Sequence, residues 1–284
     1  MSQDEREGGS VLGCRPLRRG HNGWRCSQLA TLSLLTILAA RSGRIANADL
    51  ALETETARVL PRGKWEAGAA FEFQKARDGR ELAFPAFVEV GLCNRLELLF
   101  EPTFYTAILP NEGNDATGIG DTEVTLTWLA RGETRRIPAF ALAGEIKFPT
   151  ATQPQIGTGQ ADFSGYLIAS KQIGKCDVHL NVGYTIAGQS SGATISNYWN
   201  FAAAVEYHLS PKFDLLAEIL ANTSSITGTG TGGESVTNPE ATGGEVVGTL
   251  GVRYHVNEHA AVFLDLLYDS QNAVGVRTGF SWKF

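Results

Sequence analysis

The chain is poor in cysteine, in long hydrophobic runs and in basic charge. Only 4 of its 284 residues are cysteine, too few for a disulfide-stabilised scaffold. The longest apolar run, Leu29–Ala40, is shorter than the ~20 residues that a membrane-spanning helix needs. Lys and Arg number 24 against 30 Asp and Glu, so the charge gives no indication of nucleic-acid binding. An apolar content of 43% also excludes a disordered chain.

The apolar run Leu29–Ala40 has the surroundings of a secretory signal peptide. Several arginines precede it, and the small-residue motif Ala46-Asn47-Ala48 follows it. A basic region, a short apolar region and an A-x-A motif are the three parts of such a signal. We therefore predict that residues 1–48 are a signal peptide cleaved after Ala48. The alternative for the apolar run is a buried helix.

From Lys64 onward, hydrophobic residues recur with a period of two. In the first stretch, Trp65, Phe71 and Phe73 alternate with polar residues such as Glu66 and Glu72. This alternation predicts strands with one apolar and one polar face, each about ten residues long, as a tilted transmembrane strand requires. Similar stretches lie at 64–75, 82–91, 96–106, 119–129, 138–148, 161–171, 177–187, 198–209, 213–222, 245–255, 260–269 and 273–284.

The connections between these stretches alternate in length. Segments 92–95, 172–176 and 210–212 are short, whereas the Gly/Ser/Thr-rich segment 223–244 is long. Short turns at one end and longer loops at the other are typical of outer-membrane barrels, unlike soluble sandwiches. The sequence therefore predicts an all-β fold, an antiparallel transmembrane β-barrel of about 12 strands with periplasmic N- and C-termini. The barrel would span residues 64–284, after a periplasmic N-terminal segment at 49–63.

The last strand carries a candidate assembly signal. Phe280, Trp282 and Phe284 alternate with small or polar residues up to the end of the sequence. An aromatic strand with a terminal Phe resembles the signal read by the bacterial outer-membrane insertion machinery. The expected partners are this machinery and outer-membrane lipid. The expected location is the outer membrane of a Gram-negative bacterium.

Three short motifs go beyond the general barrel pattern. They are Gly118-Ile119-Gly120-Asp121, Lys147-Phe148-Pro149-Thr150 and the segment from His179 to Tyr184. Together they resemble the family named for the meta-pathway of phenol degradation, a set of outer-membrane transport proteins, over most of the chain from Thr54. The resemblance implies an outer-membrane channel or transporter, with aromatic compounds among its candidate solutes. It implies no catalytic residues.

We find no catalytic, cofactor or metal site in the sequence. Residues 228–233 match G-x-G-x-x-G, but no helix follows them, so a dinucleotide site is not expected. His255 and His259 form a weak zinc-like pair that we expect to be solvated in a turn. No Ser-His-acid set can be assembled, so an enzyme is not expected. Cys93 and Cys176 fall in separate turns, too far apart for a disulfide.

The polar faces of the predicted strands supply candidate pore-lining residues. These are Glu66, Glu72, Glu89, Glu97, Glu101, Asp121, Glu123, Glu145, Lys147, Tyr166, Arg253 and Arg277, and Lys283 also faces inward. An apolar inward set comprises Phe87, Leu99, Tyr105, Tyr166, Ile168, Leu216 and Phe263. The charged groups either pair across the lumen and brace the barrel or create a field that orients polar solutes. Because acidic side chains outnumber basic ones, weak cation selectivity is expected.

The leading functional prediction is passive passage of small solutes across the outer membrane, with aromatic or hydrophobic compounds among them. Two alternatives stay open at this point. One is a structural outer-membrane barrel with a closed lumen, and the other is a secreted soluble β protein. No cofactor and no nucleic-acid partner are expected, and the pattern does not identify the solute.

Overall fold

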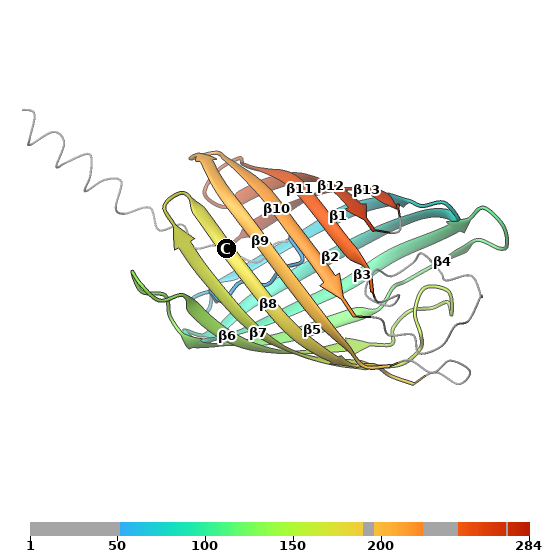
Figure 1. Ribbon diagram of the computed structural model, residues 1–284, viewed down its shortest axis with the longest axis horizontal. Coiled ribbons are helices and arrows are strands. Elements are labelled where there is room, and N and C mark those ends of the chain that lie inside the picture. The colour runs from blue at the N-terminus through green and yellow to red at the C-terminus, as the bar shows by residue number, and fades with distance from the viewer. Residues whose placement is uncertain (1–51, 190–195, 224–243, 271) are drawn as a thin grey trace, which may run out of the picture. The chain divides into compact units, whose positions relative to one another are not determined.

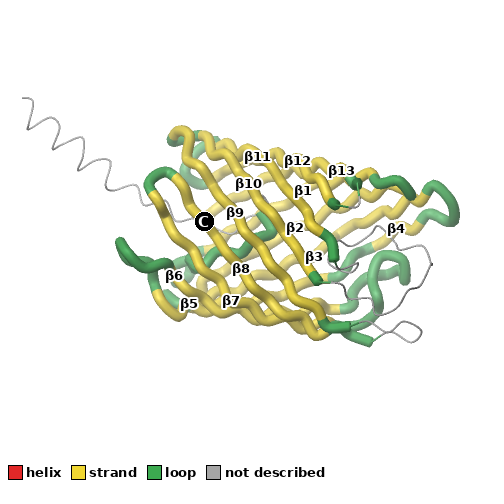
Figure 2. The backbone as a smooth tube through the Cα atoms, viewed as in Figure 1, coloured by secondary structure: helices red, strands yellow, loops and turns green. Residues whose placement is uncertain are grey.

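The computed structural model describes residues 52–189, 196–223, 244–270 and 272–284 (Figure 1). The predicted signal peptide and the G-x-G-x-x-G match lie outside the described residues. All regular secondary structure in the described ranges is β-strand (Figure 2). Among these residues, no helix is long and apolar enough to cross a bilayer.

Twelve long strands and one short strand make up the described structure. They are β1 (Trp65–Lys75), β2 (Gly79–Cys93), β3 (Leu96–Pro110), β4 (Ala116–Gly118), β5 (Thr122–Arg131), β6 (Ala139–Phe148), β7 (Asp162–Ile173), β8 (Cys176–Ile186), β9 (Tyr198–Ser210), β10 (Phe213–Asn222), β11 (Val246–His255), β12 (Ala260–Asp269) and β13 (Val274–Lys283). The short strand β4 pairs with the end of β3, and β3 then pairs with β5.

The twelve long strands close into one antiparallel barrel. Each pairs with the long strands next to it in the chain, and the last strand, β13, pairs with β1. This seam runs from the Glu66–Lys283 pair to the Lys75–Val274 pair, along almost all of β1. Closure leaves no free sheet edge, which is the condition for a sheet to cross a membrane. The predicted all-β, twelve-strand antiparallel barrel is therefore confirmed.

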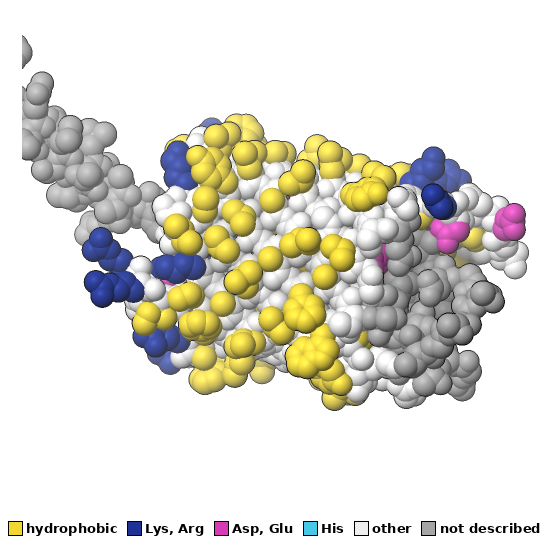
Figure 3. Space-filling model, viewed as in Figure 1, with side chains coloured by type: hydrophobic (Ala, Val, Ile, Leu, Met, Phe, Trp, Pro, Cys, Tyr) yellow, Lys and Arg dark blue, Asp and Glu magenta, His cyan; other side chains and the backbone are white. Residues whose placement is uncertain are grey.

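Alternation along each strand separates an apolar outer wall from a polar interior. On β13, Val274 and Phe280 are each 53% exposed, whereas Arg277 between them is 1% exposed. Figure 3 shows hydrophobic side chains spread over the visible wall, with Lys and Arg near its two ends, several of them at the left. The exposed bases Arg95, Lys175 and Lys212 lie in the short turns. The outer wall thus matches the apolar band of a membrane barrel.

A β-bulge in β3 reverses one predicted side-chain direction. The β2–β3 register passes from Ala83–Thr106 to Pro85–Thr103, so β3 contains one extra residue there. As a result Tyr105, predicted to face inward, is 42% exposed, and its ring centroid lies 6.1 Å from that of Phe84. The prediction for Tyr105 was wrong because an extra residue shifts the alternation by one. Pro85 lacks a backbone N–H, and proline in sheets is found at such irregular positions.

Candidate functional site

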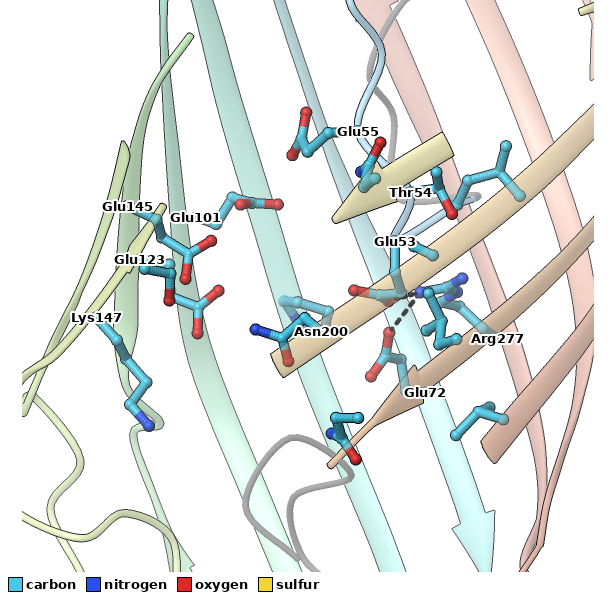
Figure 4. Close-up of a pocket in the computed structure, with 18 of the residues that line it drawn as sticks. Glu53, Thr54, Glu55, Glu72, Glu101, Glu123, Glu145, Lys147, Asn200 and Arg277 are labelled. Atoms are coloured by element: carbon cyan, nitrogen blue, oxygen red, sulfur yellow. Dashed lines mark hydrogen bonds and ion pairs between the residues drawn. The ribbon is translucent and has the colours of Figure 1, made fainter. Parts of the chain in front are cut away.

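The barrel encloses a cavity of about 410 Å³. Its lining comes mainly from the halves of the strands that lead to the longer loops, and residues 52–56 line it as well. Figure 4 shows part of this lining, with charged side chains from opposite walls turned toward the same space. The cavity is the candidate functional site.

Nine of the twelve candidate pore-lining residues line this cavity. They are Glu72, Glu101, Asp121, Glu123, Glu145, Lys147, Tyr166, Arg253 and Arg277. The other three, Glu66, Glu89 and Glu97, are 0%, 1% and 4% exposed and lie on strand positions nearer the short turns. That these residues line a conducting pore stays a prediction.

Acidic residues dominate the cavity wall. Eleven Asp and Glu residues line it, against three Lys and Arg residues. The acidic residues that the sequence analysis did not single out are Glu53, Glu55, Glu81, Asp162, Glu206 and Glu245. Glu206 could have been found, because it lies on the polar face of a predicted strand. Glu53 and Glu55 could not, because they precede the first strand and follow no period.

One wall of the cavity carries a group of carboxylates on neighbouring strands. Glu101 of β3 lies directly opposite Glu123 of β5, and Glu123 lies opposite Lys147 of β6. The Tyr166 hydroxyl donates to Glu145 Oε1 at 3.4 Å. In Figure 4 this acidic wall and Arg277 lie on opposite sides of the space. Like charges directly opposite each other in a sheet are unfavourable, so this grouping does not serve barrel stability.

The basic residues of the lining have acidic partners. Lys147 forms an ion pair with Asp162, and Arg253 Nη1 lies 2.6 Å from Glu206 Oε2. Arg277 contacts Glu53 and lies 3.7 Å from Glu72 and 3.4 Å from Asp265. These pairs neutralise part of the wall but leave acidic residues in clear excess.

The described chain before β1 runs inside the barrel, and we call residues 52–60 the strap. Backbone N–H groups of the strap donate to side chains of three different strands. Thr54 N lies 2.6 Å from Glu218 Oε1 of β10, and Ala57 N lies 2.8 Å from Ser170 Oγ of β7. Leu60 N donates to Glu97 of β3. Figure 1 shows this first part of the described chain in blue, behind β8 and β9.

Small side chains on β6 make room for the strap. Ala57, which is fully buried, packs in one cluster with Ala139, Ala141, Ala143 and Ile168. An alternating run of alanine facing inward leaves space along the wall that larger residues would fill. The sequence analysis placed residues 49–63 in the periplasm. The structure places residues 52–60 against inward-facing side chains of the barrel, and the periplasmic location of residues 49–63 stays a prediction.

Ion pairs hold the strap near the short turns. Arg58 Nη2 lies 2.6 Å from Asp177 Oδ1 and 2.9 Å from Glu133 Oε2 in the β5–β6 turn. Glu133 also accepts from Lys171 Nζ at 2.7 Å. Although burial alone would raise it, the hydrogen bonds from Lys171 and Arg58 hold the pKa of Glu133 below its ordinary value. The turn carboxylate is thus kept charged as a partner for Arg58.

The raised pKa of Glu55 predicts that the stability of the protein depends on pH. Burial, reinforced by Glu97, Glu145 and Glu53, raises the pKa of Glu55 from 4.5 to about 8. The carboxyl of Glu55 would ionise near pH 4.5 in the unfolded chain but only near pH 8 in the folded protein. The native state is therefore most stable, with respect to this group, below pH 4.5, and that stability is lost as the pH rises toward 8. We therefore expect a Glu55→Gln variant to melt at the wild-type temperature near pH 4 and above it near pH 9. Thermal unfolding in detergent across this range checks the prediction, and a difference that does not change with pH would contradict it.

A line of Ser, His and Glu crosses three strands beside the strap. Ser170 Oγ lies 2.8 Å from His179 Nδ1, and His179 Nε2 lies 3.6 Å from Glu206 Oε1. The sequence alone did not reveal this set. Ser170 is 0% exposed and its Oγ accepts the Ala57 N–H, so the hydroxyl holds the strap and has no open approach for a substrate.

The histidine pair and the two cysteines considered from the sequence lie at the ends of strands or in turns. His255 ends β11, and its Nε2 lies 2.5 Å from Asp214 Oδ2, while its side chain remains 22% exposed. The neighbouring strand supplies this acid, which the local sequence could not indicate. His259 is exposed, as expected. Within the described ranges, no cluster of three or more His, Cys, Asp or Glu has a metal-binding arrangement. Cys93 and Cys176 are free thiols.

The aromatic residues of the last strand face outward beside the seam. Phe280, Trp282 and Phe284 are 53%, 44% and 46% exposed. The Phe284 ring stacks on Trp65 with centroids 3.5 Å apart, and Phe284 N donates to Trp65 O at 2.9 Å. Their role as an assembly signal stays a prediction, but the contact ties the end of the chain to the first strand.

The fold is similar to solved outer-membrane barrels. The COG4313 outer membrane channel from Pseudomonas putida F1 superposes with a TM-score of 0.60 at 13% identity, covering 84% of this chain and 100% of that one. The NanC porin gives 0.53 at 11% identity, covering 77% and 100%. The KdgM porin gives 0.51 at 8% identity, covering 76% and 99%. At these identities the likeness concerns the fold.

Comparison of the sequence with protein families gives a match over nearly all of the barrel chain. No curated protein matches. The family model described as "Putative MetA-pathway of phenol degradation" matches residues 49–283. The match covers the strap and every strand, so the resemblance inferred from the short Gly-rich motifs is confirmed. The chain is therefore a member of the phenol-degradation meta-pathway family of outer-membrane β-barrels.

Proposed function

We propose that this protein is an outer-membrane channel for the passive passage of small solutes. The proposal rests on a polar cavity of about 410 Å³ inside a closed barrel whose outer wall is apolar. Small barrels without a transport role fill their interior with side chains, whereas larger ones enclose cavities or channels. The solved barrels of similar fold named above are a channel and two porins, which supports the proposal.

The proposal includes the route by which the protein reaches the membrane. Residues 1–48 would direct export, the insertion machinery would read the last strand, and both ends of the mature barrel chain would face the periplasm. Broad exposure of large apolar side chains on every long strand argues against the soluble alternative, since soluble monomers seldom expose such patches.

Aromatic or partly hydrophobic solutes fit part of the lining. Phe87, Leu99 and Tyr166 face the cavity among its carboxylates. The family name supports the same class of compound. Liposome swelling with a panel of phenols, aromatic acids and sugars tests the proposal directly. Passage of at least one small solute is expected, whereas swelling no faster than with empty liposomes would favour a closed structural barrel.

The excess of carboxylates predicts a preference for cations. In a narrow lumen with low-dielectric walls, fixed charges focus the field, and at 0.1 M salt the screening length is about 10 Å. Reversal potentials in a KCl gradient should show weak cation selectivity that decreases at high salt. Glu101→Gln with Glu123→Gln should reduce it, whereas Glu258→Gln, on an exposed turn, should not. A clear anion preference would contradict this assignment of the lumen.

A further inference from the structure

The end of the barrel with the short turns is strongly basic. Its described connections, residues 61–64, 94–95, 132–138, 174–175, 211–212 and 256–259, contain seven Lys and Arg against two acids, and all seven bases are exposed. The described connections at the other end contain one base, Arg77, against five acids. In Figure 3 several Lys and Arg lie at the left, which is the end away from β4 in Figure 1. We call the seven bases the basic rim: Arg62, Lys64, Arg95, Arg135, Arg136, Lys175 and Lys212.

The two acids in these short connections have partners outside the rim. Glu133 lies 2.9 Å from Arg58 and 2.7 Å from Lys171, and both of these bases lie outside the connections. Glu258 lies 3.6 Å from His259 Nε2 in the β11–β12 turn, which carries no Lys or Arg. The acids of the turns therefore do not balance the charge of the basic rim, and such a one-signed surface favours a negatively charged partner.

Four bases of the rim occupy the same position in different hairpins. Each directly precedes a strand that starts at the short-turn end: Lys64 before β1, Arg95 before β3, Lys175 before β8 and Lys212 before β10. The carbonyl oxygen of each accepts a hydrogen bond of 2.8–2.9 Å from a backbone N–H of the neighbouring strand, in the order Gly91, Leu129, His208 and His255. This repeated bond fixes the backbone of the four bases at one level around the end of the barrel.

Exposed aromatic side chains lie on the outer wall beside this level. Each of the four bases is followed by an aromatic residue or by a residue that pairs with one on the neighbouring strand, in the order Trp65, Trp128, Tyr207 and Phe213. These aromatic residues are 38–46% exposed. Aromatic side chains gather where the hydrocarbon of a membrane meets its headgroups. The four bases lie further from the middle of the strands, and thus at the level of the headgroups.

We propose that the basic rim binds the negatively charged headgroups of phospholipids that surround the short-turn end of the barrel. Ammonium and guanidinium groups form charge-assisted hydrogen bonds with phosphate oxygens. The rim bases come from five of the six connections at this end, so they are spread around most of the circumference. Lipid surrounds a barrel on every side, whereas a docked protein would need charge on one side only. The proposal does not depend on the channel function.

Quenching of tryptophan fluorescence by brominated lipid tests the proposal. The chain from Asp49 onward is refolded into vesicles that mix anionic phosphatidylglycerol with phosphatidylcholine, and one of the two lipids is brominated in each series. Trp199→Phe removes the tryptophan at the long-loop end, so the emission comes from Trp65, Trp128 and Trp282 near the rim. Comparison of the two series gives the binding preference for phosphatidylglycerol over phosphatidylcholine at that end of the barrel.

Phosphatidylglycerol should be preferred about fivefold at low salt, the gain expected for one base beside an anionic surface, and the preference should disappear at high salt. Lys64→Gln with Arg95→Gln and Lys212→Gln should lower the preference roughly twofold or more. The matched control removes three exposed bases around the β1–β2 loop at the opposite end and should keep the preference: Lys75→Gln, Arg77→Gln and Arg80→Gln. Heat-modifiable gel mobility verifies that both variants fold.

Three results would overturn lipid binding by the rim. The first is equal affinity for the two lipids when the rim is intact, and the second is a folded rim variant that keeps the preference of the control; both would point to a water-soluble acidic partner instead. Inorganic phosphate at equal ionic strength should lower the preference no more than chloride does, and a larger effect would mean that the rim takes the free anion. Arg135→Gln with Arg136→Gln, in the exposed β5–β6 turn, is a second variant that should lower the preference.

Discussion

Replacing Arg277 with methionine should lower the free energy of unfolding by about 3–5 kcal/mol, the usual cost of removing one partner from a buried ion pair. Arg277 is 1% exposed and lies directly between Glu72 of β1 and Asp265 of β12 in the strand registers. It also contacts Glu53 of the strap. Without the guanidinium, three carboxylates would share one site, and Asp265 is itself fully buried.

Denaturant-induced unfolding in detergent micelles measures this loss. Arg80→Met is the matched control because Arg80 is exposed at the start of β2, and its effect should stay within about 0.5 kcal/mol. If the Arg277→Met protein were as stable as the control, the guanidinium of Arg277 would not be what holds the carboxylates of Glu53, Glu72 and Asp265 together.

Removal of the aromatic side chains of β13 should block barrel assembly. Deleting Phe284, or replacing both Phe280 and Trp282 with alanine, removes exposed rings beside the seam and the stack on Trp65. These rings face lipid and contribute little to the interior. The expected result is therefore loss of the heat-modifiable, folded species in the outer membrane, with unassembled protein accumulating instead.

The control for this prediction removes equivalent rings elsewhere on the wall. Phe163 and Phe201 are 52% and 45% exposed on β7 and β9, far in sequence from the last strand. Phe163→Ala with Phe201→Ala should assemble at close to the wild-type level. If both sets of variants assemble equally well, the end of β13 is not the recognition signal.

Much of the barrel could be predicted from the sequence because strand alternation is a local property. Each side chain's face depends on its parity along the strand, so the placement of Glu72, Glu101 and Arg277 at the cavity followed directly from the register. The same parity rule failed at Tyr105, where one extra residue in β3 reversed the direction. A bulge depends on how two strands pair, and no single stretch of sequence contains that information.

The network of histidines and acids shows the same limit. Each of Ser170, His179 and Glu206 lies on a predicted strand, but their alignment depends on the relative registers of β7, β8 and β9. The acidic partner of His255, Asp214, lies on the adjacent strand β10, so the sequence around His255 did not reveal it. Periodicity within a strand predicts which face a residue takes, but not which residue of the neighbouring strand lies beside it.

The sequence by itself determined the strands, their two faces, the order of short and long connections and the family. These follow from a period of two over about ten residues and from short motifs, both of which are local. Only the tertiary structure decided which inward residues contact one another inside the barrel. The Thr54–Glu218 and Glu53–Arg277 contacts join residues 164 and 224 positions apart. Residues 52–60 have no periodicity of their own, so their place inside the lumen is decided by the wall that surrounds them.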